Sequence, residues 1–317
     1  MATASVEVLC DDYEHALAVG GTFGDVEIKR RIASTREMFQ LALQRKPFEV
    51  AEFSISNYIM MRSQGARWLT ALPVFPYRAF RHNIVHVRKD SPLKAPMDLR
   101  GKTVGLPDYS MTAAVWTRGL YKAEYGLDPG EIAWVSRLNQ RFPTPAGVNL
   151  RLTGDDLEDL LERGEIDALL IPDLSEKAQA HGKFRRLLPN HPKDEREYFL
   201  KTGIYPPNHV LVVNLDVVKN FERIAAPVFD AFCASKAKAL DRQLGATLVP
   251  WARDYWEETL ALFHHDPLPY GLTPTNRRAV ETVAGFLAEQ GLIARPLALT
   301  DLFDPIAMQL SEASPVA

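Results

Sequence analysis

HVLVVNLDVV, residues 209–218, is a nearly continuous run of apolar residues. Such a run predicts a strand that is covered on both faces, because a strand with one face in water alternates apolar and polar residues. Strands and helices are predicted to alternate before it, and only helices are predicted after it. This alternation indicates an α/β fold with largely parallel sheets.

The predicted elements before residue 209 form two similar blocks. They are separated by DSPLKAPMDLRG (90–101), which is rich in proline and charge and predicts a crossover. We therefore predict two lobes, one of residues 1–90 and 208–317 with a helical C-terminal tail, the other of residues 91–207. A length of 317 residues also favours two cores. A chain that crosses twice leaves a cleft between lobes, and such clefts are favoured ligand sites.

The individual elements follow from periodicity and from start and stop signals. Ser34 and Glu37 have the spacing of a capping box, and Ser56 or Asn57 is the expected N-cap of the next helix. The expected strands are 6–10, 26–33, 48–54, 68–75, 83–87, 102–107, 132–138, 148–152, 166–172 and 209–218. The expected helices are 34–44, 56–64, 110–126, 155–164, 194–203, 225–243, 251–264 and 275–291.

Composition excludes several functions. Lysine and arginine number 37 against 40 aspartates and glutamates, so the net charge of −3 gives no electrostatic case for nucleic acid. No apolar run is long enough to span a membrane. Cys10 and Cys233 are the only cysteines, which excludes a disulfide framework or a cysteine metal site and fits a reducing compartment. The N-terminus lacks a signal pattern, so we expect a cytoplasmic protein.

The stretch YRAFRH (77–82) lies between two predicted strands. Arg78 and Arg81 can each bind a carboxylate through two hydrogen bonds, and His82 is a candidate proton donor. The alternative is a solvated turn whose arginines pair with nearby acids. A metal site shared by His82 and His86 is rejected, because four residues of strand span ~13 Å.

A second candidate anion site is the helix start in GLPDYSMTAAVW (105–116). Backbone N–H groups at a helix N-terminus attract an anion. The residues expected to contribute are Tyr109, Ser110, Met111 and Thr112. An ordinary N-cap is the alternative.

FEVAEFSISNY (48–58) places small polar side chains at the end of a strand, the end that faces the ligand crevice in α/β folds. Ser54 and Asn57 are the candidates there, with helix capping as the alternative. Glu52 shares the parity of Ser54, and if buried it needs a partner, for which an arginine from 78–81 is suitable. His209 stands where the chain re-enters the first lobe, and a structural role is its alternative.

Recognised catalytic motifs are absent from the sequence, including G-x-S-x-G, the Walker motif, G-x-G-x-x-G after a strand and H-E-x-x-H. No metal-ligand spacing is visible, so we expect no metal. A site assembled from Asp11, Glu52 and a histidine is left open.

Four segments together resemble the 4,5-dihydroxyphthalate decarboxylase family, in order, over roughly residues 5 to 305. They are VFPYRAFRHNIVHV (74–87), SPLKAPMDLRGKTVGLPDYSMTAAVWTRG (91–119), REYFLKTGIYPPNHVLVV (196–213) and PYGL (269–272). That family is similar in fold to type 2 periplasmic solute-binding proteins, which agrees with two lobes. The chain differs at residues 10–14, where the family tends to have tryptophan followed by Asp-Tyr-Asp and this sequence has Cys-Asp-Asp-Tyr-Glu.

The resemblance implies non-oxidative decarboxylation of 4,5-dihydroxyphthalate, or of a close catechol carboxylate, to protocatechuate. No organic cofactor is expected, because the substrate ring is its own electron sink. The expected partner is a small aromatic dicarboxylate, with no nucleic acid and no membrane, and a homo-oligomer is left open. The alternatives are a solute-binding protein without catalysis, or an enzyme of another class in the same cleft.

For this reaction His82 is the first choice of proton donor and His209 the second, while Glu52 or Asp11 accepts a hydroxyl proton. Arg118 is expected on the outer face of its helix. The residues expected to bind substrate are Arg78, Arg81, Ser54, Asn57, Tyr109, Ser110, Met111, Thr112 and Asp11.

Overall fold

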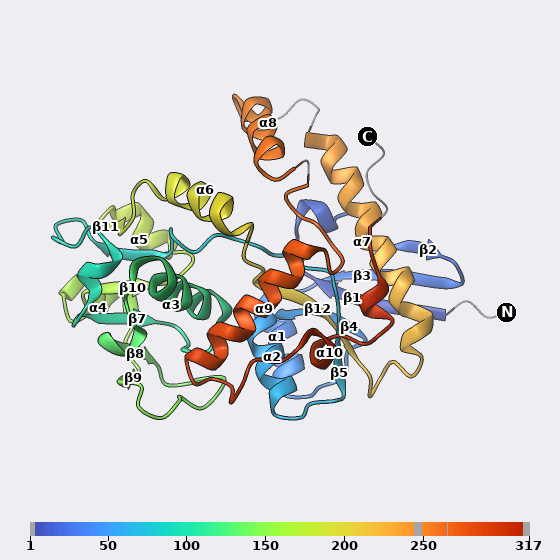
Figure 1. The fold of residues 1–317 in the computed structure, drawn as a ribbon, viewed down its shortest axis with the longest axis horizontal. Helices are drawn as coiled ribbons and strands as arrows, with labels where there is room; N and C mark the ends of the chain where they lie inside the picture. The colour runs from blue at the N-terminus through green and yellow to red at the C-terminus, as the bar shows by residue number, and fades with distance from the viewer. Residues whose placement is uncertain (1–3, 244–248, 265, 313–317) are drawn as a thin grey trace. The chain divides into compact units, whose positions relative to one another are not determined.

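The computed structural model describes residues 4–243, 249–264 and 266–312. The chain forms two compact units. The first consists of Met1–Arg78, Pro207–Glu281 and Leu297–Ala317, and the second of Ala79–Pro206 and Thr282–Pro296. Each unit contains one six-stranded sheet with helices packed on it (Figure 1).

Apart from residue 207, the unit boundaries differ from the predicted ones at two places. Residues 79–90 and 282–296 were expected in the first lobe, and both lie in the second unit. Strand β6 (Val85–Arg88) pairs antiparallel with β10 (Ala168–Leu170) and β11 (Phe184–Arg186), so its hydrogen bonds place it in the second sheet. Sequence periodicity identifies a strand but does not name its partner.

The first sheet has the order β2-β3-β1-β4-β12-β5. Strand β1 runs parallel to β3 and β4, whereas β12 runs antiparallel to both β4 and β5. The sheet is therefore mixed, and the expectation of largely parallel sheets is wrong here. The returning strand β12 lies between β4 and β5 and runs in the direction opposite to both. Its strands are β1 (Ala4–Cys10), β2 (Gly21–Phe23), β3 (Val26–Ile32), β4 (Val50–Ser54), β5 (Leu69–Leu72) and β12 (His209–Asn214).

The helices of the first unit include α7 (Phe221–Gln243), which contacts β2 and β3, and α1 (Thr35–Leu43), which contacts β4. Helix α8 (Ala252–Leu262) buries none of its residues. The remaining elements are η1 (Glu14–Ala16), α2 (Ile55–Ser63), α10 (Leu299–Leu302), η4 (Ala307–Gln309) and the first part of α9 (Pro274–Glu289).

The second sheet has the order β11-β6-β10-β7-β8-β9, with its last four strands parallel. Besides β6, β10 and β11 it contains β7 (Thr103–Leu106), β8 (Ala133–Arg137) and β9 (Leu150–Thr153). A buried cluster joins α4 to this sheet through Val135, Leu157, Leu160, Leu161, Ile166 and Leu169. The helices are α3 (Thr112–Tyr125), α4 (Leu157–Arg163), α5 (Glu176–His181), α6 (His191–Thr202), η2 (Pro96–Leu99) and η3 (Pro129–Glu131).

The helix ends agree with the predicted signals at two positions and differ at one. Ser34 caps α1 by accepting the N–H of Glu37 at 3.3 Å, and Gly126 closes α3 in the left-handed region at φ 72°. Helix α2 is capped by Ser54, not by Ser56 or Asn57 as expected, because the helix begins directly after β4. Short elements such as β2, β11 and α5 carry too few residues to show a period, and they were not predicted.

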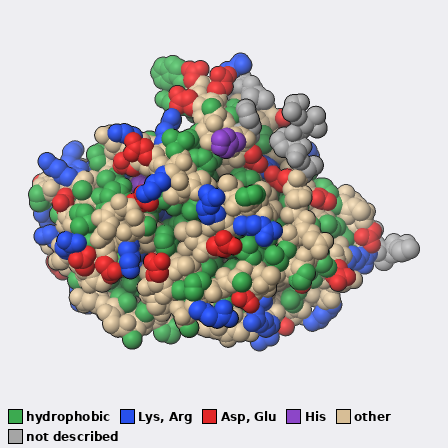
Figure 2. Space-filling view, in the orientation of Figure 1, with side chains coloured by type: hydrophobic (Ala, Val, Ile, Leu, Met, Phe, Trp, Pro, Cys, Tyr) green, Lys and Arg blue, Asp and Glu red, His purple; other side chains and the backbone are tan. Residues whose placement is uncertain are grey.

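The described surface carries charges of both signs. On the face shown in Figure 2, lysines and arginines lie among aspartates and glutamates, in keeping with the small net charge. Among the described residues, no helix combines the length and the apolar character that crossing a bilayer requires.

A substitution at Gly119 tests how closely α3 packs against the end of α9. A Cβ at this position would lie 2.2 Å from the ring of Phe286, which also contacts the Trp116 ring edge-on. We expect Gly119→Ala to lower the free energy of unfolding by about 1–3 kcal/mol in urea titrations, although alanine is the better helix former.

Gly285→Ala in α9 is the matched control, since a Cβ there meets nothing within 4 Å. This variant should gain about 0.4–1 kcal/mol. Equal stability of the two variants would contradict the close contact between α3 and α9.

Candidate active site

The centre of the candidate site is a hydrogen-bonded pair on adjacent strands of the first unit. Glu52 lies in β4 and His209 begins β12, and the antiparallel register places His209 opposite Ser54 and Leu211 opposite Glu52. The Nδ1 atom of His209 is hydrogen-bonded to Oε1 of Glu52. The Glu52 side chain has no exposed surface, whereas 13% of the His209 side chain is exposed. Only the histidine of the pair is therefore open to a ligand.

Two further donors reach the Glu52 carboxylate from the end of β1. The Tyr13 hydroxyl donates to Oε1 at 2.7 Å, and the backbone N–H of Asp11 donates to Oε2 at 3.1 Å. Because β1 and β4 are parallel neighbours, their carboxyl ends meet at one edge of the sheet. Both oxygens of this buried carboxylate are thus satisfied, as a buried charge requires.

The environment keeps Glu52 ionised. Burial alone would raise the pKa of its carboxyl, but the charge and hydrogen bond of His209, with the Tyr13 hydroxyl and the Asp11 N–H, hold that pKa below its ordinary value. Burial, followed by the neighbouring Glu52 charge, raises the pKa of Tyr13. Tyr13 therefore stays protonated and acts as a hydrogen-bond donor to the carboxylate.

Aromatic rings surround the pair. The Tyr13 ring stacks almost parallel to the rings of His15 and Tyr77, at centroid distances of 5.2 and 6.0 Å. The His209 ring lies 5.0 Å from that of Tyr77 and meets Phe39 edge-on at 5.1 Å. The carbonyl of Tyr77 accepts the backbone N–H groups of residues 208 and 209, which holds the backbone of Tyr77 against the start of β12.

The arrangement supports proton transfer. A carboxylate that accepts from Nδ1 orients the imidazole, and it leaves Nε2 as the nitrogen for a substrate. Flat aromatic neighbours suit a flat ring as ligand. His209 thus combines access, orientation and a stabilising anion.

The residues of YRAFRH (77–82) are divided between the two units. Arg78 ends the first segment of the first unit, while Arg81 and His82 belong to the second unit. The Nη2 of Arg78 donates to Asn276 Oδ1 at 2.6 Å and to the carbonyl of Pro269 at 3.2 Å. His209, rather than an arginine from 78–81, is the basic residue hydrogen-bonded to Glu52.

His82 is almost completely buried and meets the Tyr198 ring edge-on at 5.5 Å. Burial, together with the nearby His191, lowers the pKa of His82 to about 4. Its Nδ1 has no hydrogen-bond partner among the residues that the structure describes. The imidazole is neutral near pH 7, which is unfavourable for the proton donor that the sequence analysis preferred. Arg81 is buried as well.

The predicted helix start at 109–112 lies in the second unit. The hydroxyl and N–H of Ser110 both donate to Asp108 Oδ1, at 2.6 and 2.9 Å, so the serine side chain closes a turn. Met111 occupies the N-cap position of α3 without a side-chain cap, and Thr112 begins the helix. The ring of Tyr109 lies 3.8 Å from the Arg118 guanidinium carbon.

Arg118 is placed differently from its expectation. It was predicted on the outer face of α3, but its side chain is buried beneath Tyr109 and Trp134. The helix is covered over most of its circumference, including by the end of α9, which the sequence had assigned to the other lobe.

The remaining predicted residues lie close to the pair but are engaged locally. Ser54 Oγ accepts the Asn57 N–H at 3.3 Å, which is the capping role considered as the alternative. The Asp11 carboxylate accepts the N–H of Asp12 at 2.8 Å, and the hydrogen bond from Asp11 to Glu52 comes from its backbone N–H. In the described part of the chain, no group of three or more histidine, cysteine, aspartate or glutamate side chains is arranged to hold a metal ion.

Sequence reasoning missed Tyr13, His15 and Tyr77. A usable signal was present: Asp-Asp-Tyr directly follows a predicted strand, at the same sheet edge as the end of 48–54. Tyr77 carried no signal of its own, since it stands within a stretch whose charges drew attention to other side chains.

Comparison with known proteins gives sequence relatives and structural neighbours. The chain is 31% identical to a 4,5-dihydroxyphthalate decarboxylase of Comamonas testosteroni over 307 residues, 90% of this chain and 92% of the relative. It is 32% identical to one of Pseudomonas putida over 146 residues, which is 43% of this chain and 57% of the relative. No family model matches the chain.

Two solved structures show the same fold. The periplasmic aliphatic sulphonate binding protein SsuA of Escherichia coli has a TM-score of 0.56 at 15% identity, covering 96% of this chain and 99% of that chain. A putative periplasmic sulfonate-binding SsuA of Methylobacillus flagellatus has a TM-score of 0.54 at 11% identity, covering 100% and 99%. The predicted α/β fold of the type 2 periplasmic-binding-protein kind is confirmed.

Glu52→Gln tests the electrostatics of the pair. Since folding lowers the pKa of this carboxyl below 4.5, its stabilisation is complete above pH 4.5 and is lost as the pH falls through the lowered value. At pH 7 we expect the variant to lose about 3–5 kcal/mol of unfolding free energy, as when one partner of a buried pair is removed.

Urea titrations of wild type and variant between pH 7 and pH 3 measure this difference. It should shrink below pH 4.5. A difference that is the same at all pH values would contradict an ionised Glu52 in the folded protein.

Proposed function

Because the chain belongs to the 4,5-dihydroxyphthalate decarboxylase family, we propose that it decarboxylates 4,5-dihydroxyphthalate, or a close catechol carboxylate, to protocatechuate and CO2. The observation that carries this proposal is the Glu52–His209 pair, which offers a partly exposed imidazole beside a buried carboxylate within a wall of aromatic rings. The identity of 31% over 90% of the chain supports the reaction class.

The substrate itself supplies the electronic driving force. Each carboxylate of 4,5-dihydroxyphthalate is para to a hydroxyl, which pushes electron density onto the carbon that carries the carboxylate. Protonation of that carbon, followed by cleavage of its bond to the carboxylate, restores the aromatic ring. The ring accepts and returns the electrons, so the proposed reaction requires no organic cofactor.

We assign the proton donor to His209. Its Nδ1 is hydrogen-bonded to the Glu52 carboxylate, whose lowered pKa keeps that carboxylate negative at neutral pH, and its Nε2 is left for the substrate. His82, with a pKa of about 4, holds no such proton at that pH. This reverses the order in which the sequence ranked the two histidines.

The balance of the step is simple. The Nε2–H of protonated His209 gives its proton to the substrate carbon, and a carbon–hydrogen bond forms. The carbon–carbon bond then breaks, its electron pair returns to the ring, and CO2 leaves. His209 ends neutral and regains a proton from water, so one proton is consumed for each CO2 released.

Glu52 and Tyr13 are positioning residues in this scheme. Both carboxylate oxygens of Glu52 already accept hydrogen bonds, and the side chain has no exposed surface, so Glu52 acts through His209. This argues against Glu52 as the acceptor of a substrate hydroxyl proton. Within the first unit, the predicted binding residue Ser54 is paired with His209 across the strands.

For the other residues expected to bind substrate, that role remains a prediction. They are Arg78, Arg81, Asn57, Tyr109, Ser110, Met111, Thr112 and Asp11. A solute-binding protein without catalysis is the competing function, because the structural neighbours named above are binding proteins.

The test is CO2 release from 4,5-dihydroxyphthalate, followed together with the ultraviolet spectrum of the product. We expect His209→Gln to lose at least 100-fold in kcat, the usual contribution of a general acid. His82→Gln should lose less than tenfold. His181→Gln is the matched control, an exposed histidine of α5, and should turn over at the wild-type rate.

Two results would overturn the proposal. Binding of 4,5-dihydroxyphthalate by the wild type without any release of CO2 would favour the solute-binding function. Wild-type turnover by a folded His209→Gln variant would remove His209 from the mechanism.

A further inference from the structure

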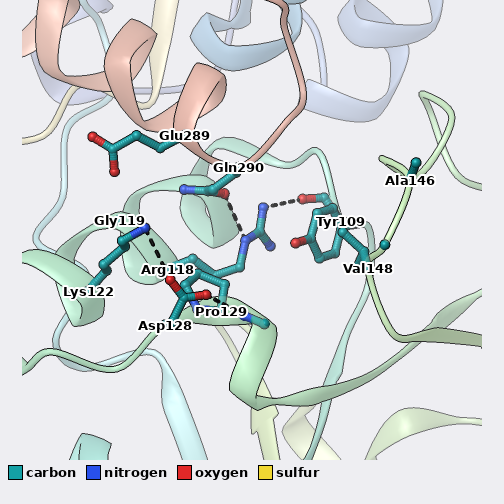
Figure 3. Close-up of a pocket in the computed structure, with 12 residues that line it drawn as sticks. Tyr109, Arg118, Gly119, Lys122, Asp128, Pro129, Ala146, Val148, Glu289 and Gln290 are labelled. Carbon is teal, nitrogen blue, oxygen red and sulfur yellow. Dashed lines mark hydrogen bonds and ion pairs between the residues drawn. The ribbon is translucent and has the colours of Figure 1, made fainter.

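Helix α3 of the second unit is packed over most of its surface. Residues 112–121 of this helix are all buried. Figure 3 shows its Arg118 between the Gln290 side chain and the Tyr109 ring, beside a cavity of about 210 Å³. The guanidinium donates from Nε to Gln290 Oε1 at 2.8 Å and from Nη2 to the carbonyl of Tyr109 at 2.7 Å. The Arg118 side chain is thus held by neighbours within its own unit.

Helix α8 of the first unit is packed very differently. None of its 11 residues is buried, and Figure 1 shows it at the top of the view, apart from the strands of its unit. Trp251, directly before the helix, is 71% exposed, and Tyr255 is 59% exposed. A helix this short is marginal in water by itself, and most helices in proteins are stabilised by packing of an apolar face. Exposed aromatic side chains on such a helix indicate a surface that a partner covers.

Four side chains form one stripe along α8, which we call the α8 stripe. They are Trp251, Tyr255, Glu258 and Leu262. At 3.6 residues per turn, these four positions fall within about 60° around the helix axis. The stripe is therefore apolar at both ends and aromatic near its middle, and it contains one carboxylate.

The charges of α8 argue against a lipid surface as the partner. Arg253 is the one basic residue in the sequence of this helix, against three acids at 254, 257 and 258. It is also paired with Glu257 at 3.0 Å. A helix that lies on a membrane carries lysines and arginines on its polar face, because lipid surfaces are commonly anionic. The α8 stripe thus suits a protein partner.

We propose that the α8 stripe binds the α8 stripe of a second copy of this chain, with the two helices antiparallel. A twofold axis between residues 256 and 257 places Trp251 opposite the partner subunit's Leu262, and Tyr255 opposite the partner subunit's Glu258. The tyrosine hydroxyl then donates to the glutamate carboxylate, and the symmetry makes each contact twice.

Charge complementarity favours this arrangement. In the antiparallel pair, the carboxylate of Glu258 meets a hydroxyl, and Asp254 lies opposite the partner subunit's Ala261. A parallel pair would place the two Glu258 side chains opposite each other, and such a meeting of like charges is unfavourable. The stripe is thus complementary to itself only when the helices run in opposite directions.

The size of the helix sets the expected strength. An 11-residue helix is about 16 Å long, which gives an interface at the small end for specific complexes. We expect a reversible dimer with a Kd in the micromolar range. This inference does not rest on the proposed decarboxylation, because no residue of α8 belongs to the Glu52–His209 site.

Sedimentation equilibrium measures the association. The average mass of the wild type should rise from 35.6 kDa toward twice that value between about 1 and about 500 µM protein. Trp251→Asn should weaken association at least tenfold, and asparagine tolerates the left-handed backbone of residue 251, at φ 60°. Leu200→Asn is the matched control, since Leu200 of α6 is 73% exposed and lies outside the stripe, and it should associate as the wild type does.

Two substitutions of Tyr255 test the direction of the helices. In the antiparallel pair, Tyr255→Lys makes an ion pair with the partner subunit's Glu258, whereas Tyr255→Glu makes a repulsion. We expect Tyr255→Glu to associate at least tenfold more weakly than Tyr255→Lys, and high salt should reduce the difference. Equal weakening by both would contradict the antiparallel arrangement, because in a parallel pair residue 255 meets its own copy.

Three further results would overturn the proposal. One is a wild type that stays at 35.6 kDa at every concentration. Another is a Trp251→Asn variant that associates as strongly as the wild type, since another surface would then mediate the association. The third is binding of the wild type to vesicles of anionic phospholipid without self-association, which would assign the α8 stripe to a membrane.

Discussion

The hydrogen bond between Glu52 and His209 is the interaction on which the candidate site depends. It requires a carboxylate with no exposed surface to remain charged. One partner from β12 and two donors from the segment that follows β1 make this favourable. Removing any donor leaves part of a buried charge unpaired, which costs more than an ordinary surface contact. The pair therefore links the local stability of the sheet edge to the orientation of one imidazole.

The topology of the first sheet makes this pair. Strand β12 enters between β4 and β5 and runs against both, so its first residue meets the last residues of β4. If β12 ran parallel to β4, its first residue, His209, would lie at the end of the sheet opposite to Ser54. The carboxyl end of β1 then delivers Tyr13 and the Asp11 N–H to the same edge. Three segments that are distant in sequence converge because strand direction, and not merely strand content, decides which ends meet.

Buried polar groups were recognisable in the sequence only in part. Glu52 could be singled out, since an acid within an apolar strand needs a partner. An arginine from 78–81 was proposed as that partner, whereas the structure provides His209. For His82 and Arg118, the predictions rested on their positions along the chain. Both side chains are buried, and burial lowers the pKa values of both. Desolvation depends on neighbours from several elements, which no local pattern contains.

The sequence by itself determined the α/β class, nearly all the longer strands and helices, and the family, because periodicity, capping signals and long motifs are local properties of the chain. Only the tertiary structure decided that β12 runs antiparallel, that residues 79–90 and 282–296 lie in the second unit, and that Tyr13 joins Glu52 and His209. It also decided that Arg118 is buried beside a cavity. These facts depend on which surfaces meet, and contacts between distant segments are set by the packing of the whole unit.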